Sequence, residues 1–136
     1  MMSSIESKDE LPKDKRSTRT KRDRKRTAKP AEKRTNVYVI ELNEAIRKNK
    51  KFTEANPNCR TDKPCLYVGM TQLDPKQRFE NHKNGIKAAR FVRNFGIRLR
   101  PRFYERYNPM TYDDAQKMER ELARRLRNRG FAVWQN

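Results

Sequence analysis

One continuous stretch, from residue 65 to residue 85, constrains the fold most, because it predicts a strand, a turn and a helix in direct succession. Its first part, Cys-Leu-Tyr-Val, is an apolar run of strand length that stops at Gly69. Asp74 then suits the N-cap of a helix, Pro75 suits its first position, and Gly85 supplies a stop. We therefore expect a buried strand at 65–68 that leads through a polar turn into a helix.

The same stretch carries polar side chains that can handle a phosphate. Arg78 and His82 are four residues apart in the expected helix, so they share one helix face. Tyr67 lies near the end of the preceding strand, and Gly69 permits a close approach of other groups to the backbone. The alternative, which these residues alone leave open, is that they are an ordinary strand aromatic and solvated helix side chains.

The rest of the chain predicts a mixture of short strands and helices. An apolar, β-branched and aromatic run at 37–42 predicts the first strand. Later in the chain, residues 97–100 alternate between apolar and basic, and Pro101 interrupts this pattern. The expected elements are a strand at 37–42, a helix at 43–50, a short helix at 86–95, an edge or bent strand at 97–105, and a short strand or packed tail at 131–134.

The last helix is expected from Thr111 to Gly130, and its apolar stripe contains a carboxylate. At about 100° per residue, the stripe spans an arc of about 140°. Its apolar members are Ala115, Met118, Leu122, Ala123 and Leu126, and Glu119 falls inside the same arc. A carboxylate directed at the core is costly unless a metal ion or a cation compensates it. Glu119 is therefore a candidate metal ligand.

The chain is strongly basic, with a formal net charge of +18 over its 136 residues. Residues 1–35 are nearly free of large apolar side chains, and we expect them to form a disordered basic tail before a domain at 36–136. The charge favours a polyanionic partner, first of all nucleic acid, through counterion release. A merely solubilised or ribosome-bound basic protein is the alternative. For the tail, a nuclear address or a solvated linker also remains open.

Membrane association and secretion are not expected. The basic tail lacks apolar anchors, and neither a membrane-spanning run nor the apolar core of a signal peptide occurs in the sequence. Cys59 and Cys65 have no further cysteine to complete a metal set, and we expect both to be reduced. The expected location is the cytoplasm, or the nucleoid in a bacterium.

Four features in sequence order together resemble the GIY-YIG nuclease superfamily, in particular its small single-domain bacterial members. They are Val37-Tyr38-Val39-Ile40, Tyr67-Val68-Gly69, Arg78 with His82, and Glu119 in a late helix. The resemblance covers the chain from Asn36 to its C-terminus. It implies an α+β fold with a small antiparallel three-stranded sheet flanked by helices.

The resemblance also implies a metal-dependent endonuclease that hydrolyses phosphodiester bonds in DNA rather than RNA. In that role Tyr67 would activate water, Tyr38 would be a second phenol, and Arg78 would bind the scissile phosphate. Glu119 would hold one Mg²⁺ or Mn²⁺, and His82 matches a histidine that assists proton transfer in part of the family. Residues expected to contact nucleic acid are Gly69, Thr71, Arg98, Arg100 and Arg102.

Two departures from the family pattern motivate a second hypothesis. Asn36 stands where the motif has its first glycine, and Met70 stands where several members carry lysine. The second hypothesis is a nucleic-acid-binding protein, for structured RNA or the ribosome, that keeps the fold without turnover.

Overall fold

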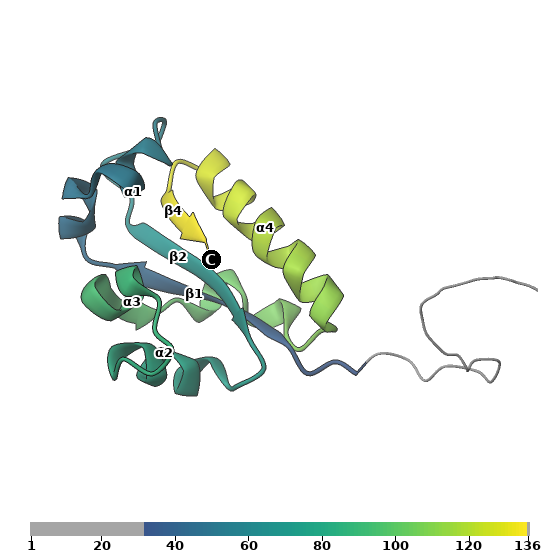
Figure 1. Cartoon of the computed structure of the whole chain (residues 1–136). Helices are drawn as coiled ribbons and strands as arrows, with labels where there is room; N and C mark the ends of the chain where they lie inside the picture. Colours follow the sequence, from purple (N-terminus) through teal and green to yellow (C-terminus); the bar gives the residue numbers. More distant parts are fainter. Residues whose placement is uncertain (1–31, 136) are drawn as a thin grey trace, which may run out of the picture. The chain divides into compact units, whose positions relative to one another are not determined.

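A four-stranded sheet forms the centre of the structure, a computed structural model that describes residues 32–135 (Figure 1). The strand order is β3-β1-β2-β4. Strand β1 (Asn36–Leu42) pairs antiparallel with β2 (Cys65–Thr71) and with β3 (Gly96–Leu99), whereas β4 (Ala132–Gln135) pairs parallel with β2. The expected α+β class is confirmed. The expected three-stranded antiparallel sheet is wrong, because the sheet is mixed and has four strands.

The fourth strand comes from the segment predicted as a short strand or a packed tail. Two strands can run parallel only if a crossover connection returns the chain to the same end of the sheet. Here α4 (Tyr112–Asn128) is the last part of that connection, and Gly130, with φ of +95°, turns the chain into β4. Ala132 and Val133 are then completely buried, so the strand completes the core.

The remaining elements are short. They are the 3-10 helix η1 (Glu44–Lys48), α1 (Lys50–Glu54), α2 (Pro75–Lys83), α3 (Arg90–Phe95), and the 3-10 helices η2 (Pro101–Phe103) and η3 (Glu105–Tyr107). The single helix expected at 43–50 is divided, because Asn49 caps a new helix. The strand expected to resume after Pro101 is wrong, and 3-10 turns occupy that segment.

The predicted helix caps are confirmed. Asp74 accepts a hydrogen bond from the backbone N–H of Lys76 (2.8 Å), and Thr111 accepts one from Asp114 (3.1 Å). Each bond satisfies one backbone donor that the first turn of a helix leaves without a partner. Gly85 follows the end of α2 and has φ of +79°, a backbone conformation that residues with a side chain rarely adopt. These local signals place α2 and α4 within one residue of their predicted starts.

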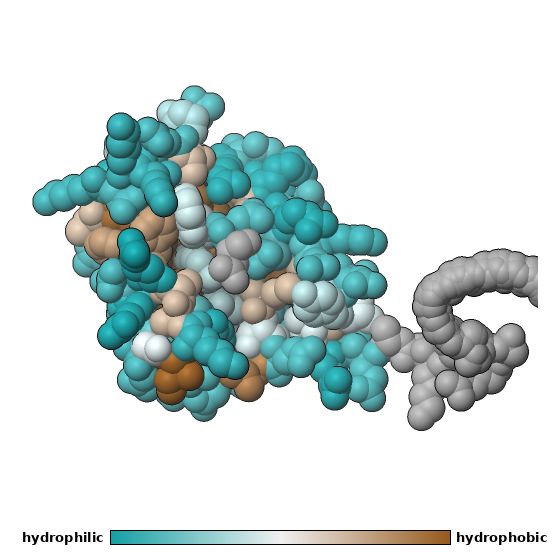
Figure 2. All heavy atoms as spheres, in the orientation of Figure 1, coloured by the Kyte–Doolittle hydropathy of each residue, from teal (hydrophilic) through white to brown (hydrophobic). Residues whose placement is uncertain are grey.

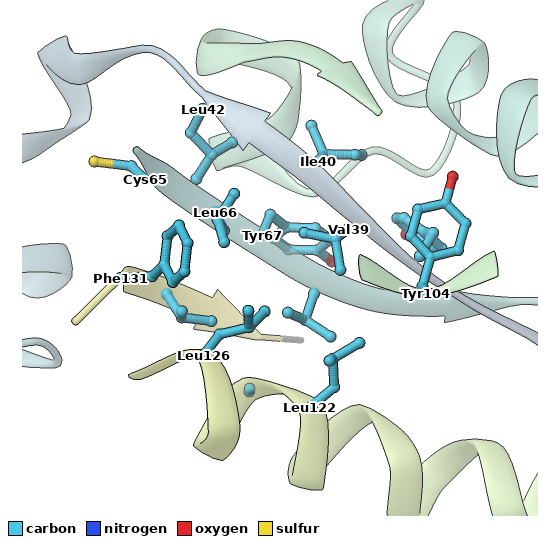
Figure 3. Close-up of a cluster of buried hydrophobic side chains, with 14 of the residues drawn as sticks. Val39, Ile40, Leu42, Cys65, Leu66, Tyr67, Tyr104, Leu122, Leu126 and Phe131 are labelled. Carbon is cyan, nitrogen blue, oxygen red and sulfur yellow. The ribbon is translucent and has the colours of Figure 1, made fainter. Parts of the chain in front are cut away.

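Helices cover both faces of the sheet. Figure 1 shows α2 and α3 on one side of β1 and β2 and α4 on the other, and the described residues expose mostly hydrophilic side chains in the view of Figure 2. Leu122 and Leu126 of α4 point toward the sheet, where Val39 and Leu66 lie (Figure 3). The predicted stripe on α4 is therefore the face that packs on the core. Its buried members are Ala115, Glu119, Leu122, Ala123 and Leu126.

The predictions for the cysteines and for the two ends of the domain have different outcomes. Cys59 and Cys65 are both free thiols, as expected, and Cys65 is buried. The predicted tail at 1–35 lies outside the described residues except for its last four positions. The proposed domain at 36–136 remains a prediction.

Candidate functional site

Three aromatic side chains that were singled out separately in the sequence meet in one cluster. Tyr38 lies opposite Gly69 in the β1–β2 register, so Tyr67, two residues earlier on β2, is its diagonal neighbour on the same face of the sheet. The two phenol rings have centroids 6.2 Å apart. The ring of His82, from α2, lies 6.1 Å from Tyr38 and 5.9 Å from Tyr67. We call these three residues the aromatic cluster.

Gly69 makes this cluster possible. A Cβ atom at position 69 would lie 2.7 Å from the Tyr38 hydroxyl oxygen and 3.0 Å from a ring carbon of Tyr67. No side chain fits at such distances without displacing a ring. Gly69 is itself buried, so it serves the packing of Tyr38, and its role as a nucleic-acid contact remains a prediction.

Two hydrogen bonds define the tautomer of His82, whose side chain is completely buried. The backbone N–H of Ala89 donates to Nδ1 (3.1 Å), so Nδ1 carries no proton. A neutral imidazole then carries its proton on Nε2, which lies 2.9 Å from the Tyr38 hydroxyl oxygen. His82 therefore donates to Tyr38. Burial and the positive charge of Arg78 lower the pKa of His82 to about 4, which keeps the ring neutral at physiological pH.

Arg78 lies beside the cluster and is held by the turn after α2. Its guanidinium donates to the carbonyl oxygens of Ile86 (3.3 Å) and Lys87 (2.9 Å). A guanidinium has five N–H donors, so these two bonds orient the side chain and leave three donors for another acceptor. Its charge also acts on both phenols, since it lowers the pKa of Tyr38 and of Tyr67.

Glu119 is the carboxylate of the site. Its side chain is only 8% exposed, and it makes no hydrogen bond or ion pair with any residue of the described part of the chain. Burial raises the pKa of the carboxyl from 4.5 to about 7, against an opposing effect of Arg120. The carboxylate lies near enough to the cluster for its negative charge to raise the pKa of Tyr38 and Tyr67.

The surroundings of the two phenols affect the ionisation of their hydroxyl groups differently. Burial raises the pKa of Tyr38 to about 12, and the charge and hydrogen-bonding capacity of Arg78 oppose that rise. Burial also raises the pKa of Tyr67, and the neighbouring Tyr38 and Glu119 add to that rise. The Tyr38 oxygen also accepts a hydrogen bond from His82 Nε2, and this bond would stabilise the ionised form of Tyr38. The surroundings therefore favour ionisation of Tyr38 over ionisation of Tyr67.

Asn36 and Met70, which depart from the GIY-YIG pattern, and Thr71, a predicted nucleic-acid contact, make structural contacts here. The side-chain amide of Asn36 donates to the carbonyl oxygen of Leu73 (3.1 Å) and so ties β1 to the turn before α2. Met70 packs against the hydrophobic core. The hydroxyl of Thr71 accepts from the backbone N–H of Leu73 (3.0 Å) within the same turn.

The arginines predicted to contact nucleic acid lie apart from the aromatic cluster, at the β3 edge of the sheet and in the turn that follows. Arg98 and Arg100 both pair with Glu41, at 3.3 Å and 3.0 Å. Arg102 is exposed. Glu41 thus offsets part of the positive charge of these arginines. Sequence spacing did not indicate this partner, because β1 and β3 are far apart in the chain.

Sequence reasoning missed two groups that shape the site. The first is the backbone N–H of Ala89, which sets the proton position on His82 and has no signature in the side-chain pattern. The second is Trp134, which pairs with Tyr67 in the register of β4 and β2. Its segment was predicted as a short strand or a packed tail, but nothing in the sequence indicated that this strand would lie beside Tyr67.

The described residues make neither a multi-ligand metal site nor a membrane span. Within residues 32–135, no three His, Cys, Asp or Glu side chains gather closely enough to hold a metal ion. Among the helices of the same region, none is long and apolar enough to cross a membrane. Comparison of the chain with protein-family models, with curated proteins and with solved structures found no match.

Proposed function

We propose that the protein is a metal-dependent endonuclease that hydrolyses phosphodiester bonds in DNA. The observation that carries this proposal is Glu119, a buried carboxylate without a partner among the described residues, whose charge acts on both phenols of the aromatic cluster. A buried carboxylate of this kind is costly, and a cation beside it would offset the cost. The resemblance of the motifs to the GIY-YIG superfamily supports the same conclusion.

The donor set fits one hydrated Mg²⁺ or Mn²⁺ ion. Magnesium commonly keeps several waters and needs only one or two carboxylates together with substrate phosphates, so a group of three protein ligands is not required. Glu119 would hold the ion, which would supply charge neutralisation at the scissile phosphate. The raised pKa of Glu119 makes this binding dependent on pH, because the carboxyl must lose its proton first.

The side chains of the cluster would bind the phosphate and move a proton. Arg78, oriented by the carbonyls of Ile86 and Lys87, would place its free N–H donors on a nonbridging phosphate oxygen. One of the two tyrosines, first ionised by loss of its hydroxyl proton to solvent, would accept the proton of the attacking water as a phenolate. The resemblance to the GIY-YIG superfamily assigns this role to Tyr67, whereas the hydrogen bond from His82 and the effect of Arg78 favour Tyr38. His82 would then position Tyr38, since its own Nε2 carries a proton.

Cleavage assays test the proposal directly. The purified protein is incubated with branched, nicked and plain duplex DNA and with RNA, in Mg²⁺, Mn²⁺ or EDTA. We expect metal-dependent cleavage that Glu119→Ala and Arg78→Ala abolish. The matched controls are Glu121→Ala and Lys76→Ala, which change a half-buried and an exposed charge on the same two helices. Lack of cleavage on every substrate would refute the proposal.

The two tyrosines are separated by their phenylalanine variants. If Tyr38 accepts the proton, Tyr38→Phe should lower the cleavage rate by about 10²-fold or more, as is usual for loss of a general base. Tyr67→Phe should then lower the rate less. A larger loss in Tyr67→Phe would instead support the role that the sequence motif assigns to Tyr67.

A second candidate function is nucleic-acid binding without turnover, and one observation favours it. Tyr38 and Tyr67 are only 2% and 1% exposed, so neither phenol reaches solvent without a local opening. If this function is correct, binding measured by fluorescence anisotropy survives both EDTA and Glu119→Ala, and no substrate is cut. Removal of residues 1–35 should weaken binding and flatten its salt dependence under either function.

A further inference from the structure

A hollow beside the aromatic cluster has the composition of a nucleotide-binding surface. It has a volume of about 440 Å³, and its lining includes Lys50, Lys51, Ala89, Arg90, Phe91 and Trp134. That volume is in the range of small-molecule sites. Three of these side chains are cationic and none of the lining residues is acidic. Lys50 pairs with Glu54 at 4.0 Å, and both side chains remain largely exposed.

The hollow and the candidate active site share structural elements. Trp134 is the register partner of Tyr67 in the parallel pair of β4 and β2, so their side chains lie on the same face of the sheet. Ala89 lines the hollow, and its backbone N–H donates to His82. A ligand in the hollow would therefore lie next to the aromatic cluster.

Trp134 is held in place but not fully covered. Its ring makes an edge-to-face contact with Phe91, with centroids 4.9 Å apart and planes at 76°. Phe91 is held in turn by Phe52, at 6.2 Å and 86°. Trp134 nevertheless keeps part of its surface exposed. A rigid, partly exposed indole among cations loses little conformational entropy when a flat ligand stacks on it.

We propose that this hollow binds an unpaired nucleotide of the substrate, with the base stacked on Trp134 and the flanking phosphates on the surrounding cations. Bases in a duplex are stacked on one another and offer no free face, whereas a single-stranded base offers its π-face to an aromatic side chain. Lys50, Lys51 and Arg90 supply the charges that a phosphate backbone requires.

This inference rests on the proposed function and sharpens its substrate class. An unpaired nucleotide next to the aromatic cluster would place the scissile phosphate at a junction between single-stranded and double-stranded DNA. The substrates selected would be branched, flapped or gapped DNA rather than an uninterrupted duplex.

The intrinsic fluorescence of the protein reports directly on this hollow, because Trp134 is its only tryptophan. The full-length protein is titrated in EDTA with a short oligodeoxythymidylate, with a hairpin duplex of the same number of phosphates, and with an abasic oligonucleotide of the same length. We expect quenching by the first probe and little by the other two. Unchanged fluorescence at saturation with oligodeoxythymidylate, or equal quenching by the abasic probe, would overturn the proposal.

Substitutions then separate stacking from folding. Binding of a fluorescein-labelled oligodeoxythymidylate is measured by anisotropy for Trp134→Leu and Trp134→Phe, with thermal unfolding as a check of the fold. Trp134→Leu should weaken binding about five- to a hundredfold, and Trp134→Phe should recover most of the loss. Lys51→Gln should also weaken binding, whereas the control Lys117→Gln, on α4, should not. Equal affinity of Trp134→Leu and the wild type would contradict stacking at this position.

The outcomes distinguish failure of this inference from failure of the proposed function. Quenching without cleavage of any substrate leaves the hollow as a binding site and removes the nuclease proposal. Cleavage of branched and plain duplex DNA at equal rates, without quenching, supports the nuclease and rejects the hollow.

Discussion

Replacing Glu119 by glutamine should stabilise the protein, and only at neutral and alkaline pH. Most substitutions of a buried side chain are destabilising, so a gain would be informative. Burial raises the pKa of the Glu119 carboxyl from 4.5 to about 7, which means that the folded state holds this proton more tightly than the unfolded state does. Stability is then lost as pH rises between these two values.

The size of the effect follows from the pKa shift. Each pKa unit corresponds to about 1.4 kcal/mol, so ionisation of Glu119 costs the folded state about 2 to 3 kcal/mol between pH 5 and pH 8. Glutamine has nearly the shape of the protonated acid and no charge to desolvate. The free energy of unfolding of Glu119→Gln should therefore be similar to that of the wild type at pH 5 and higher at pH 8.

Urea unfolding followed by circular dichroism at the two pH values measures this difference. The contribution of His82 has the opposite sign, since its pKa falls from 6.5 to about 4, but it is present in both proteins and cancels in the comparison. Glu121→Gln is the matched control, because Glu121 is on the same helix and its pKa is lowered to about 2 by Arg124 and Arg125. The control should not be stabilised at pH 8.

Two results would refute the reasoning. Equal stabilities of Glu119→Gln and the wild type at both pH values would mean that the Glu119 carboxylate is not desolvated. Equal destabilisation at both pH values would mean that its protonated form makes a specific contact.

If Glu119 also holds a metal, Mg²⁺ at pH 8 should raise the melting temperature of the wild type and leave that of Glu119→Gln unchanged.

Three further predictions concern the packing around the site. Gly69→Ala should lower the free energy of unfolding by about 1 to 3 kcal/mol, because its Cβ would lie 2.7 Å from the hydroxyl of Tyr38; an unchanged denaturation midpoint would argue against that packing. His82 is the only histidine, so the ¹⁵N NMR signals of its ring can be assigned directly. They should show an unprotonated Nδ1 and a protonated Nε2 between pH 5 and pH 8, and the ring should titrate only near pH 4. A titration midpoint near pH 6.5 would contradict the burial of His82. Asn56→Ala should lower the free energy of unfolding by about 1 to 3 kcal/mol, because Asn56 is 5% exposed and its side-chain oxygen accepts a hydrogen bond from the buried N–H of Val133 (2.8 Å). Loss of hydrogen-exchange protection at the Val133 amide would confirm this cause.

The elements that were predicted correctly are those whose signals are local. Asp74 and Thr111 cap helices through bonds to residues two or three positions away, so their effect can be read from spacing alone. The burial of Glu119 was also predictable, because the 3.6-residue period of α4 places it between Ala115 and Leu122 on one face. The strand prediction after Pro101 was wrong. The alternating pattern there is typical of a strand, whereas the chain forms two short 3-10 helices.

The sequence by itself thus determined the α+β class, the two central strands, the helices that carry Arg78, His82 and Glu119, and the basic character of the chain. Only the tertiary structure decided that β4 joins the sheet beside β2, since a parallel pairing depends on the path of a whole crossover. It also decided that Ala89 sets the proton on His82 and that Trp134 lies beside Tyr67. Contacts between distant segments depend on register and packing, which no local spacing encodes. The candidate residues could therefore be named from the sequence, and their geometry could not.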